Sequence, residues 1–215
     1  MIKKLIIFDL DGTLLDTSKD LMTSMNKMLE GYGYPLITLE QAKQYIGNGA
    51  RNFVLKSLPE CGKDKVDEAL KIYNSIYNAS GSPYTCLYDG IKEVLNEVKE
   101  AGALVAIVSN KPQPSTDEVY DKYLKEFNFD CVYGKREGFK HKPEKECGEY
   151  VLQSLNVKRE DVIVVGDGET DVMTAINAQM NGIAVLWGYR SKEQLKTAGA
   201  KVFAETPLDL LNLIH

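Results

Sequence analysis

Two carboxylates one residue apart follow a short apolar run near the N-terminus. Leu5-Ile6-Ile7-Phe8 is followed directly by Asp9-Leu10-Asp11-Gly12-Thr13. Parallel α/β sheets carry their chemistry at the C-terminal ends of the strands, so a buried strand over Leu5–Phe8 places both acids at that edge. Such a pair can bind a hard cation together, or one acid can attack an electrophile while the other transfers protons. The pattern predicts a catalytic segment, and its alternative is an Asx-type turn that closes the strand.

Three further polar segments lie where predicted strands end or a predicted helix begins. Ser109-Asn110-Lys111 follows the apolar run Leu104–Val108, and Gly166-Asp167-Gly168-Glu169-Thr170-Asp171 follows Val162–Val165. His141-Lys142-Pro143 precedes a helical pattern. Acids packed after a buried strand repel one another unless a cation is present, so the acidic run is the more specific signal. Taken alone, the serine also fits a helix cap and the lysine also fits a solvated loop.

The apolar periodicity predicts the elements that must position these residues. Helical patterns, with no strand between them, run from about residue 17 to Gly31, over 39–46, over 50–58 and over 64–78, and a linker follows at 79–83. From residue 84 onward helices alternate with strands: helix 91–98 with Asp89 as cap and Gly102 as stop, strand 104–108, helix 115–126, strand 129–133, helix 147–155, strand 162–165, helix 172–179 and strand 183–186.

This alternation predicts an α/β fold with a Rossmann-like parallel sheet and right-handed crossovers. The all-helical block interrupts it after the first strand. We therefore expect an α/β core domain of residues 1–16 and 83–215, with an inserted helical domain of residues 17–82.

Length and composition limit the possible partners. The 215 residues are 44% hydrophobic, and the formal net charge is −5, which argues against nucleic acid or an anionic membrane as the main partner. The four cysteines lie far apart, which favours reduced thiols over a zinc site or disulfides. No apolar run has transmembrane length and no signal peptide is recognisable. We expect a cytoplasmic protein, monomeric or weakly dimeric.

In their order along the chain, the four polar segments resemble the motifs of the haloacid dehalogenase-like phosphohydrolase superfamily. These motifs are Asp-x-Asp-Gly-Thr, a serine or threonine at a strand end, a lysine often followed by proline, and Gly-Asp-x-x-x-Asp. The resemblance covers the whole chain, including the helical insert. It implies a phosphoryl transfer in which charge neutralisation and in-line positioning dominate.

The resemblance also implies a role for each residue. Asp9 is the nucleophile that forms an aspartyl-phosphate, and Asp11 protonates the leaving group and then deprotonates water. Ser109 binds a phosphoryl oxygen, and Lys142 offsets the negative charge. The remaining residues hold magnesium or shape the site. The Mg²⁺ ligands are Asp9, the Asp11 carbonyl and Asp167, with Asp171 acting directly or through water, while Thr13 and Asn110 contribute to the substrate pocket.

The helical insert resembles a cap domain that carries substrate specificity. Its segment Gly47-Asn48-Gly49-Ala50-Arg51 resembles the cap loop of phosphoglycolate phosphatases, with backbone N–H groups and a guanidinium suited to an anion. Residues 186–190, Leu-Trp-Gly-Tyr-Arg, share that resemblance, although their aromatic rings fit a core plug equally well. The predicted substrate is a small phosphorylated metabolite, with phosphoglycolate as the leading hypothesis.

Several alternatives remain open at this point. An inorganic pyrophosphatase or a β-phosphoglucomutase-like mutase would share every core motif. A non-catalytic regulator is disfavoured because all the required residues are present. A dinucleotide-dependent oxidoreductase is disfavoured because no Gly-x-Gly-x-x-Gly occurs. A Ser-His-Asp hydrolase is disfavoured because no Gly-x-Ser-x-Gly occurs and His215 is the last residue.

Overall fold

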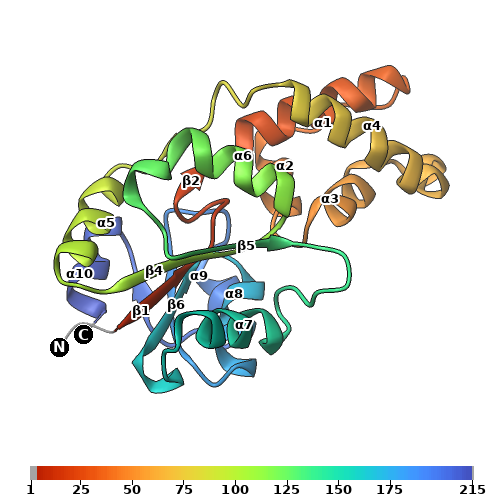
Figure 1. Ribbon diagram of the computed structural model, residues 1–215. Helices are drawn as coiled ribbons and strands as arrows, with labels where there is room; N and C mark the ends of the chain where they lie inside the picture. Colours follow the sequence, from red (N-terminus) through yellow and green to blue (C-terminus); the bar gives the residue numbers. More distant parts are fainter. Residues whose placement is uncertain (1–3, 215) are drawn as a thin grey trace. The chain divides into compact units, whose positions relative to one another are not determined.

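The computed structural model describes residues 4–214. Residue 1, where the predicted core domain begins, and His215, where it ends, lie outside this range. The chain divides into two compact units, one comprising Asp16–Cys86 and the other the chain up to Leu15 and from Leu87 onward. Figure 1 shows the elements of both units. No helix in the described range is long and apolar enough to cross a membrane.

The discontinuous unit is built on a six-stranded sheet in the order β5-β4-β1-β6-β7-β8. All its strand pairs are parallel. β1 lies between β4 and β6, so the segment that follows β1 emerges at the middle of the C-terminal edge (Figure 1). The strands are β1 (Leu5–Phe8), β4 (Leu104–Pro112), β5 (Cys131–Lys135), β6 (Val162–Gly166), β7 (Asn181–Val185) and β8 (Phe203–Ala204).

Both faces of the sheet are covered, which explains the uninterrupted apolar run of β1. Ile6 and Phe8 join the core cluster on one face, which also contains residues of the helices α5 and α10. Leu5 and Ile7 join the cluster on the other face, with residues of α7 and α8. The helices of this unit are α5 (Ile91–Glu100), α6 (Gln113–Tyr123), α7 (Lys145–Leu155), α8 (Glu169–Asn177), α9 (Lys192–Thr197) and α10 (Leu210–Leu213).

β4 differs from its predicted range in a way that matters for the site. The predicted strand ends at Val108, but the observed strand continues to Pro112. Its partner β5 begins at Cys131, two residues after the predicted start. The pairing passes from Val108↔Tyr133 to Pro112↔Lys135, with a register irregularity between. The extra residues on β4 form a bulge, a feature that re-aims side chains next to active sites.

Other predicted boundaries also require correction. Asp89 is not the cap of α5, because Gly90 occupies that position with φ +92°, a conformation that favours glycine. The predicted helix 115–126 ends as α6 at Tyr123, and a separate 3₁₀ turn covers Lys125–Phe127. The predicted helix 172–179 begins earlier, at Glu169, and ends at Asn177, and the strand predicted over 183–186 is Asn181–Val185. The segment after residue 190, for which no element was predicted, contains α9, β8 and α10.

The continuous unit is helical, and buried apolar residues on one stripe of each long helix form its core. Met25, Met28 and Leu29 of α1 and Tyr73 of α4 are buried. Asn26 ties this unit together by exchanging hydrogen bonds with the backbone of Ile37. The helices are α1 (Ser18–Gly31), α2 (Leu39–Tyr45), α3 (Ala50–Ser57) and α4 (Val66–Ala79), with a 3₁₀ turn at Glu60–Lys65 where the predicted last helix was to begin.

The chain passes between the units twice, and the two crossing segments pair with each other. They are β2 (Leu15–Asp16) and β3 (Cys86–Leu87), which form a separate two-stranded sheet. Within the helical unit, the buried Asp20 carboxylate accepts hydrogen bonds from the Tyr84 amide and the Thr85 hydroxyl. This contact fixes the start of α1 to the segment that leaves the unit.

Candidate active site

Three buried carboxylates meet where β1 and β6 end. Asp9 follows β1, and its amide donates to the Val165 carbonyl at 2.9 Å, which continues the pairing of the two strands. Asp167 follows β6, and Asp171 lies in the first turn of α8. Carboxylate oxygens of Asp9, Asp167 and Asp171 lie within 4.8 Å of one another. The adjacency of β1 and β6 therefore brings together acids that are more than 150 residues apart in the sequence.

Lys142 bridges two of these acids. Its Nζ lies 2.6 Å from Asp9 Oδ1 and 2.6 Å from Asp171 Oδ1, and its side chain is only 2% exposed. The Asn110 amide group donates to the Lys142 carbonyl at 3.2 Å, which holds the loop that carries the lysine. A buried ammonium between two carboxylates compensates part of their repulsion.

Asp171 is oriented by backbone as well as by Lys142. Its Oδ2 accepts the Gly168 amide at 2.9 Å. At Gly166 a Cβ would overlap the Asp171 carboxylate, so a glycine there allows the acid to approach the end of the strand. Asp171 is thus fixed through both oxygens.

Asp167 is held from the opposite side by the segment after β7. The Tyr189 amide donates to its Oδ2 at 2.7 Å, and the Thr13 hydroxyl donates to its Oδ1 at 3.4 Å. At Gly12 and Gly188 a Cβ would overlap the Asp167 side chain. A glycine at position 12 is therefore required by the neighbouring acid, and its φ of +92° also favours glycine.

Burial and mutual repulsion shift the protonation of this cluster. Burial, followed by the Asp171 charge, raises the pKa of Asp167 to about 7, while the Tyr189 amide and Arg190 oppose that rise. Burial and Asp171 raise the pKa of Asp9 well above its usual range, against the influence of Lys142. Burial alone would lower the pKa of Lys142, but Asp171 and Asp9 raise it above its usual value. The lysine is therefore charged, whereas the three acids would carry more negative charge than it can balance if all of them were ionised.

A second lysine faces Asp11. Lys111 Nζ lies 3.1 Å and 3.2 Å from the two carboxylate oxygens of Asp11. The Lys111 side chain is 3% exposed and that of Asp11 is 13% exposed. No role for Lys111 was predicted from the sequence. Its position inside the β4 bulge depends on pairing that a single sequence does not reveal.

The bulge buries the whole Ser109-Asn110-Lys111 segment. The predicted placement after the strand is therefore wrong, since all three residues lie within β4. The Ser109 hydroxyl accepts the Lys111 amide at 3.2 Å, and the Thr116 hydroxyl donates to the Lys111 carbonyl at 3.2 Å. Both backbone polar groups of Lys111 are thus bound by side-chain hydroxyls.

The donor set fits a hard divalent cation. Three carboxylates converge, and together with Asp11 they make four acids against two lysines, a net charge of two minus when all are ionised. Buried charge of this kind is strongly unfavourable unless a cation or protons neutralise it. Oxygen ligands without nitrogen or sulfur are the preference of Mg²⁺. Residues Asp9, Asp167 and Asp171 are those that would hold it.

The segment Trp187–Arg190 supports the site. The Trp187 indole N–H donates to the Thr13 carbonyl at 3.0 Å, and the ring packs against the core cluster. Arg190 Nε donates to Glu169 Oε2 at 2.8 Å, which fixes the start of α8. The sequence left open whether these aromatic residues belong to a substrate loop or pack in the core. The structure supports packing in the core, where Trp187 also holds the Asp9–Thr13 loop through its hydrogen bond.

The predicted anion-binding segment lies in the helical unit. Gly47 and Gly49 have φ of +115° and +81°, and Gly49 is the cap residue of α3. The exposed Arg51 guanidinium pairs with Asp67 at 2.9 Å. The Gly-x-Gly turn into a helix is thus present, with Asn48 between the two glycines.

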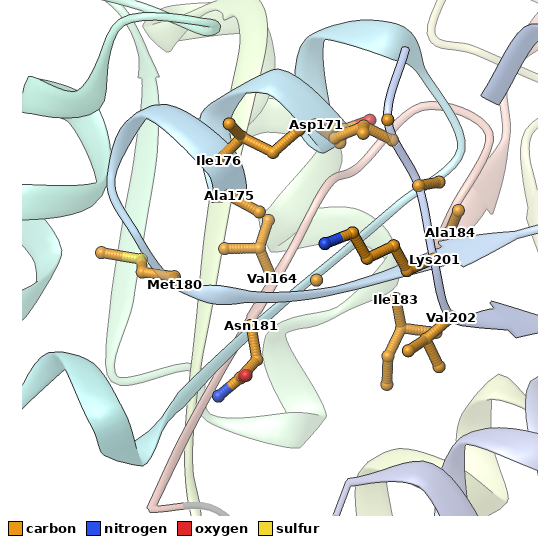
Figure 2. Close-up of a pocket in the computed structure, with 14 residues that line it drawn as sticks. Val164, Asp171, Ala175, Ile176, Met180, Asn181, Ile183, Ala184, Lys201 and Val202 are labelled. Carbon is orange, nitrogen blue, oxygen red and sulfur yellow. The ribbon is translucent and has the colours of Figure 1, made fainter. Parts of the chain in front are cut away.

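A separate groove of about 540 Å³ lies in the sheet-bearing unit between α8 and the segment before β8. Figure 2 shows apolar walls from α8 and β7, with Lys201 and Val202 on the other side. Asp171 is the one acid of the cluster among the lining residues. Neither Asp9 nor Asp167 lines this groove, so it borders the acidic cluster at Asp171 alone among the three acids.

Comparisons with known proteins agree on one family. The family described as haloacid dehalogenase-like hydrolase matches residues 6–185. The phosphoglycolate phosphatase of Vibrio parahaemolyticus is 29% identical, covering 98% of this chain and 96% of the relative. The corresponding protein of Vibrio cholerae is 30% identical, over 91% and 89%. A crystal structure from Lactobacillus delbrueckii subsp. bulgaricus superposes with a TM-score of 0.93 at 29% identity, covering 100% of this chain and 99% of that one.

Proposed function

Because this chain belongs to the haloacid dehalogenase-like hydrolases and is a phosphatase of that family, we propose that it hydrolyses a small phosphate monoester through an aspartyl-phosphate on Asp9. The observation that carries this proposal is the position of Asp9. Its carboxylate stands at the central strand end, against a buried lysine and within 4.8 Å of two further acids. A nucleophile for phosphorus needs this neutralisation, because two anions must approach each other.

In the first step, an Asp9 oxygen attacks phosphorus and the bond from phosphorus to the substrate alkoxide breaks. The Asp11 carboxyl gives its proton to the departing oxygen, so an alcohol leaves. Lys142 neutralises charge on Asp9 as the phosphoryl group arrives, and Ser109 donates to a phosphoryl oxygen. Asp9 and Asp11 follow the same strand end two residues apart, which suits an attack and a proton transfer on opposite sides of one phosphorus.

In the second step, water attacks phosphorus and Asp11 accepts its proton. The bond between phosphorus and Asp9 breaks, its electron pair returns to the carboxylate, and inorganic phosphate leaves. Mg²⁺ held by Asp9, Asp167 and the Asp11 carbonyl, with Asp171 direct or through water, would supply positive charge for the phosphoryl oxygens. Asp171 also holds Lys142 in place.

Phosphoglycolate is the proposed substrate. The printed names of the Vibrio relatives support it, and so does the Gly47-Asn48-Gly49 turn with Arg51, which offers amides and a guanidinium to a second anionic group. We propose that residues 17–82 act as the cap that carries this specificity, and that Thr13 and Asn110 of the sheet-bearing unit contribute to substrate binding. The enzyme would act in the cytoplasm, as a monomer or weak dimer, on a small metabolite and not on nucleic acid or a membrane.

The test is a substrate panel with magnesium present or chelated. Phosphate release is measured from 2-phosphoglycolate, pyrophosphate and hexose phosphates, for the natural chain and for Asp9→Asn. We expect 2-phosphoglycolate to have the highest kcat/KM, chelation to abolish release, and Asp9→Asn to be inactive yet folded. Release from pyrophosphate alone would contradict the monoesterase assignment, and conversion of hexose phosphate isomers without phosphate release would indicate a mutase.

A further inference from the structure

Lys111 is a second buried lysine at the strand ends, and the mechanism above gives it no task. A buried ammonium is strongly unfavourable unless it is paired. Here its partner is Asp11, and Nζ lies at nearly equal distances, 3.1 Å and 3.2 Å, from the two carboxylate oxygens. An ammonium placed symmetrically on a carboxylate restricts rotation of that carboxylate. Lys111 therefore fixes the direction of Asp11.

The backbone of Lys111 is itself fixed. The Ser109 hydroxyl accepts its amide and the Thr116 hydroxyl donates to its carbonyl. The β4 bulge adds the residues that turn this segment toward the end of β1. A lysine held at both backbone groups and buried along its side chain is preorganised, which is the arrangement that supports an active-site group.

The two buried lysines divide the acids between them. Lys142 pairs with Asp9 and Asp171, whereas Lys111 pairs with Asp11. The first pairing concerns the residue that receives the phosphoryl group, and the second concerns the residue that moves the proton.

We infer that Lys111 is a positioning residue that aims the Asp11 carboxylate at the water that hydrolyses the aspartyl-phosphate. The inference rests on the proposed function. In this step the water oxygen bonds to phosphorus, its proton passes to Asp11, and the bond from phosphorus to Asp9 breaks. Without Lys111 the carboxylate turns away, and the phosphoenzyme persists.

The experiment separates the two steps with p-nitrophenyl phosphate. Its leaving group departs as a stable anion and needs no proton, so the first step with this substrate is insensitive to Asp11. Rapid mixing with magnesium gives a burst of nitrophenolate for the first step and a steady rate for the second. We expect Lys111→Met to keep the burst rate and an amplitude near one per chain, while its steady rate falls about 100-fold. Acid-quenched Lys111→Met should contain accumulated phosphoenzyme.

Matched variants control for other effects. Lys111→Arg keeps a cation against Asp11 and should recover a large part of the steady rate. Lys92→Met removes an exposed lysine of the same unit, paired with Glu126, and should leave both rates unchanged. If Lys111→Met does not fold, as judged by circular dichroism, Lys111→Gln serves for the same comparison.

The outcomes distinguish this inference from the proposed function. A burst and a steady rate reduced by the same factor would overturn the inference and indicate a role in binding the phosphoryl group. A steady rate unchanged in Lys111→Met would also overturn it. An unmodified chain that forms no phosphoenzyme and releases no nitrophenolate would contradict the proposed function itself.

Discussion

The acidic cluster makes a quantitative prediction about stability when no metal is bound. The perturbation is Asp167→Asn, which removes one negative charge and keeps the side-chain shape. The pKa of Asp167 lies at about 7 in the folded chain, against an ordinary value of 3.8. Between these two values the folded chain holds a proton that the unfolded chain has lost, so the free energy of unfolding falls as pH rises through this window.

The size of the effect follows from the same two values. At about 1.36 kcal/mol per pH unit, the raised pKa of Asp167 lowers the free energy of unfolding by roughly 4 kcal/mol above pH 7, where the folded acid ionises. At about pH 5.5, where the folded chain holds the proton, it lowers it by roughly 2 kcal/mol. Asparagine avoids this cost and can still accept the Tyr189 amide through its carbonyl, as the protonated acid does. The bond from that amide to the ionised acid is already reflected in the pKa of about 7. Relative to the natural chain, the variant should therefore gain about 4 kcal/mol at about pH 8 and about 2 kcal/mol at about pH 5.5.

The assay is thermal unfolding followed by the fluorescence of Trp187, the one tryptophan of the chain. In chelator at about pH 8, a gain of about 4 kcal/mol corresponds to a Tm increase of about 8 to 16 °C for a chain of this size. Added Mg²⁺ at about 100 times its Kd should raise the free energy of unfolding of the natural chain by about 2.7 kcal/mol, and its Tm with it, but should have little effect on Asp167→Asn. Asp121→Asn, at an exposed ion pair with Lys125, is the matched control.

Two results would refute the reasoning. One is a difference in Tm between Asp167→Asn and the natural chain that is the same at both pH values, since this would mean that Asp167 does not hold its proton in the folded state. The other is an equal response of both chains to Mg²⁺, since this would remove Asp167 from the metal site.

Two further predictions concern the same unit and the thiols. In urea unfolding, Gly12→Ala should be at least about 2 kcal/mol less stable than Gly102→Ala. Both positions have positive φ, but only at Gly12 would the added Cβ overlap the Asp167 side chain. Equal losses of stability would show that the close approach of Gly12 to Asp167 is unimportant. Iodoacetamide should label the exposed Cys61 within minutes. It should label the buried Cys147 only on unfolding, because burial raises the pKa of that thiol to about 11. Early labelling of Cys147, located by peptide mass spectrometry, would contradict this.

The sequence was sufficient for the elements whose signal is local. The four-residue apolar run of β1 matches its predicted range because that strand is buried on both faces. The resemblance to a family of phosphohydrolases is confirmed by the family match over residues 6–185. The roles of the individual site residues remain proposals, although Asp9, Asp167, Asp171 and Lys142 lie together.

The sequence was insufficient where structure depends on distant partners. The bulge in β4 exists because of its pairing with β5, so neither the length of the strand nor the burial of Lys111 follows from local periodicity. Asp89 is a residue type that often caps helices, but the cap position of α5 is Gly90, whose backbone is left-handed. That conformation belongs to the turn before α5, which the type of residue at position 89 does not predict. β8 has two residues, too few for any period to be recognised.

The most direct test of the central claim is to trap the phosphoryl group on Asp9. The chain is mixed with excess 2-phosphoglycolate and Mg²⁺, quenched in acid and treated with borohydride, which reduces an acyl phosphate to an alcohol. The account predicts homoserine at position 9 in the peptide that contains Asp9, and none when substrate or Mg²⁺ is omitted. Substrate turnover with an unmodified Asp9, or with the label at Asp11 or Asp167, would contradict it.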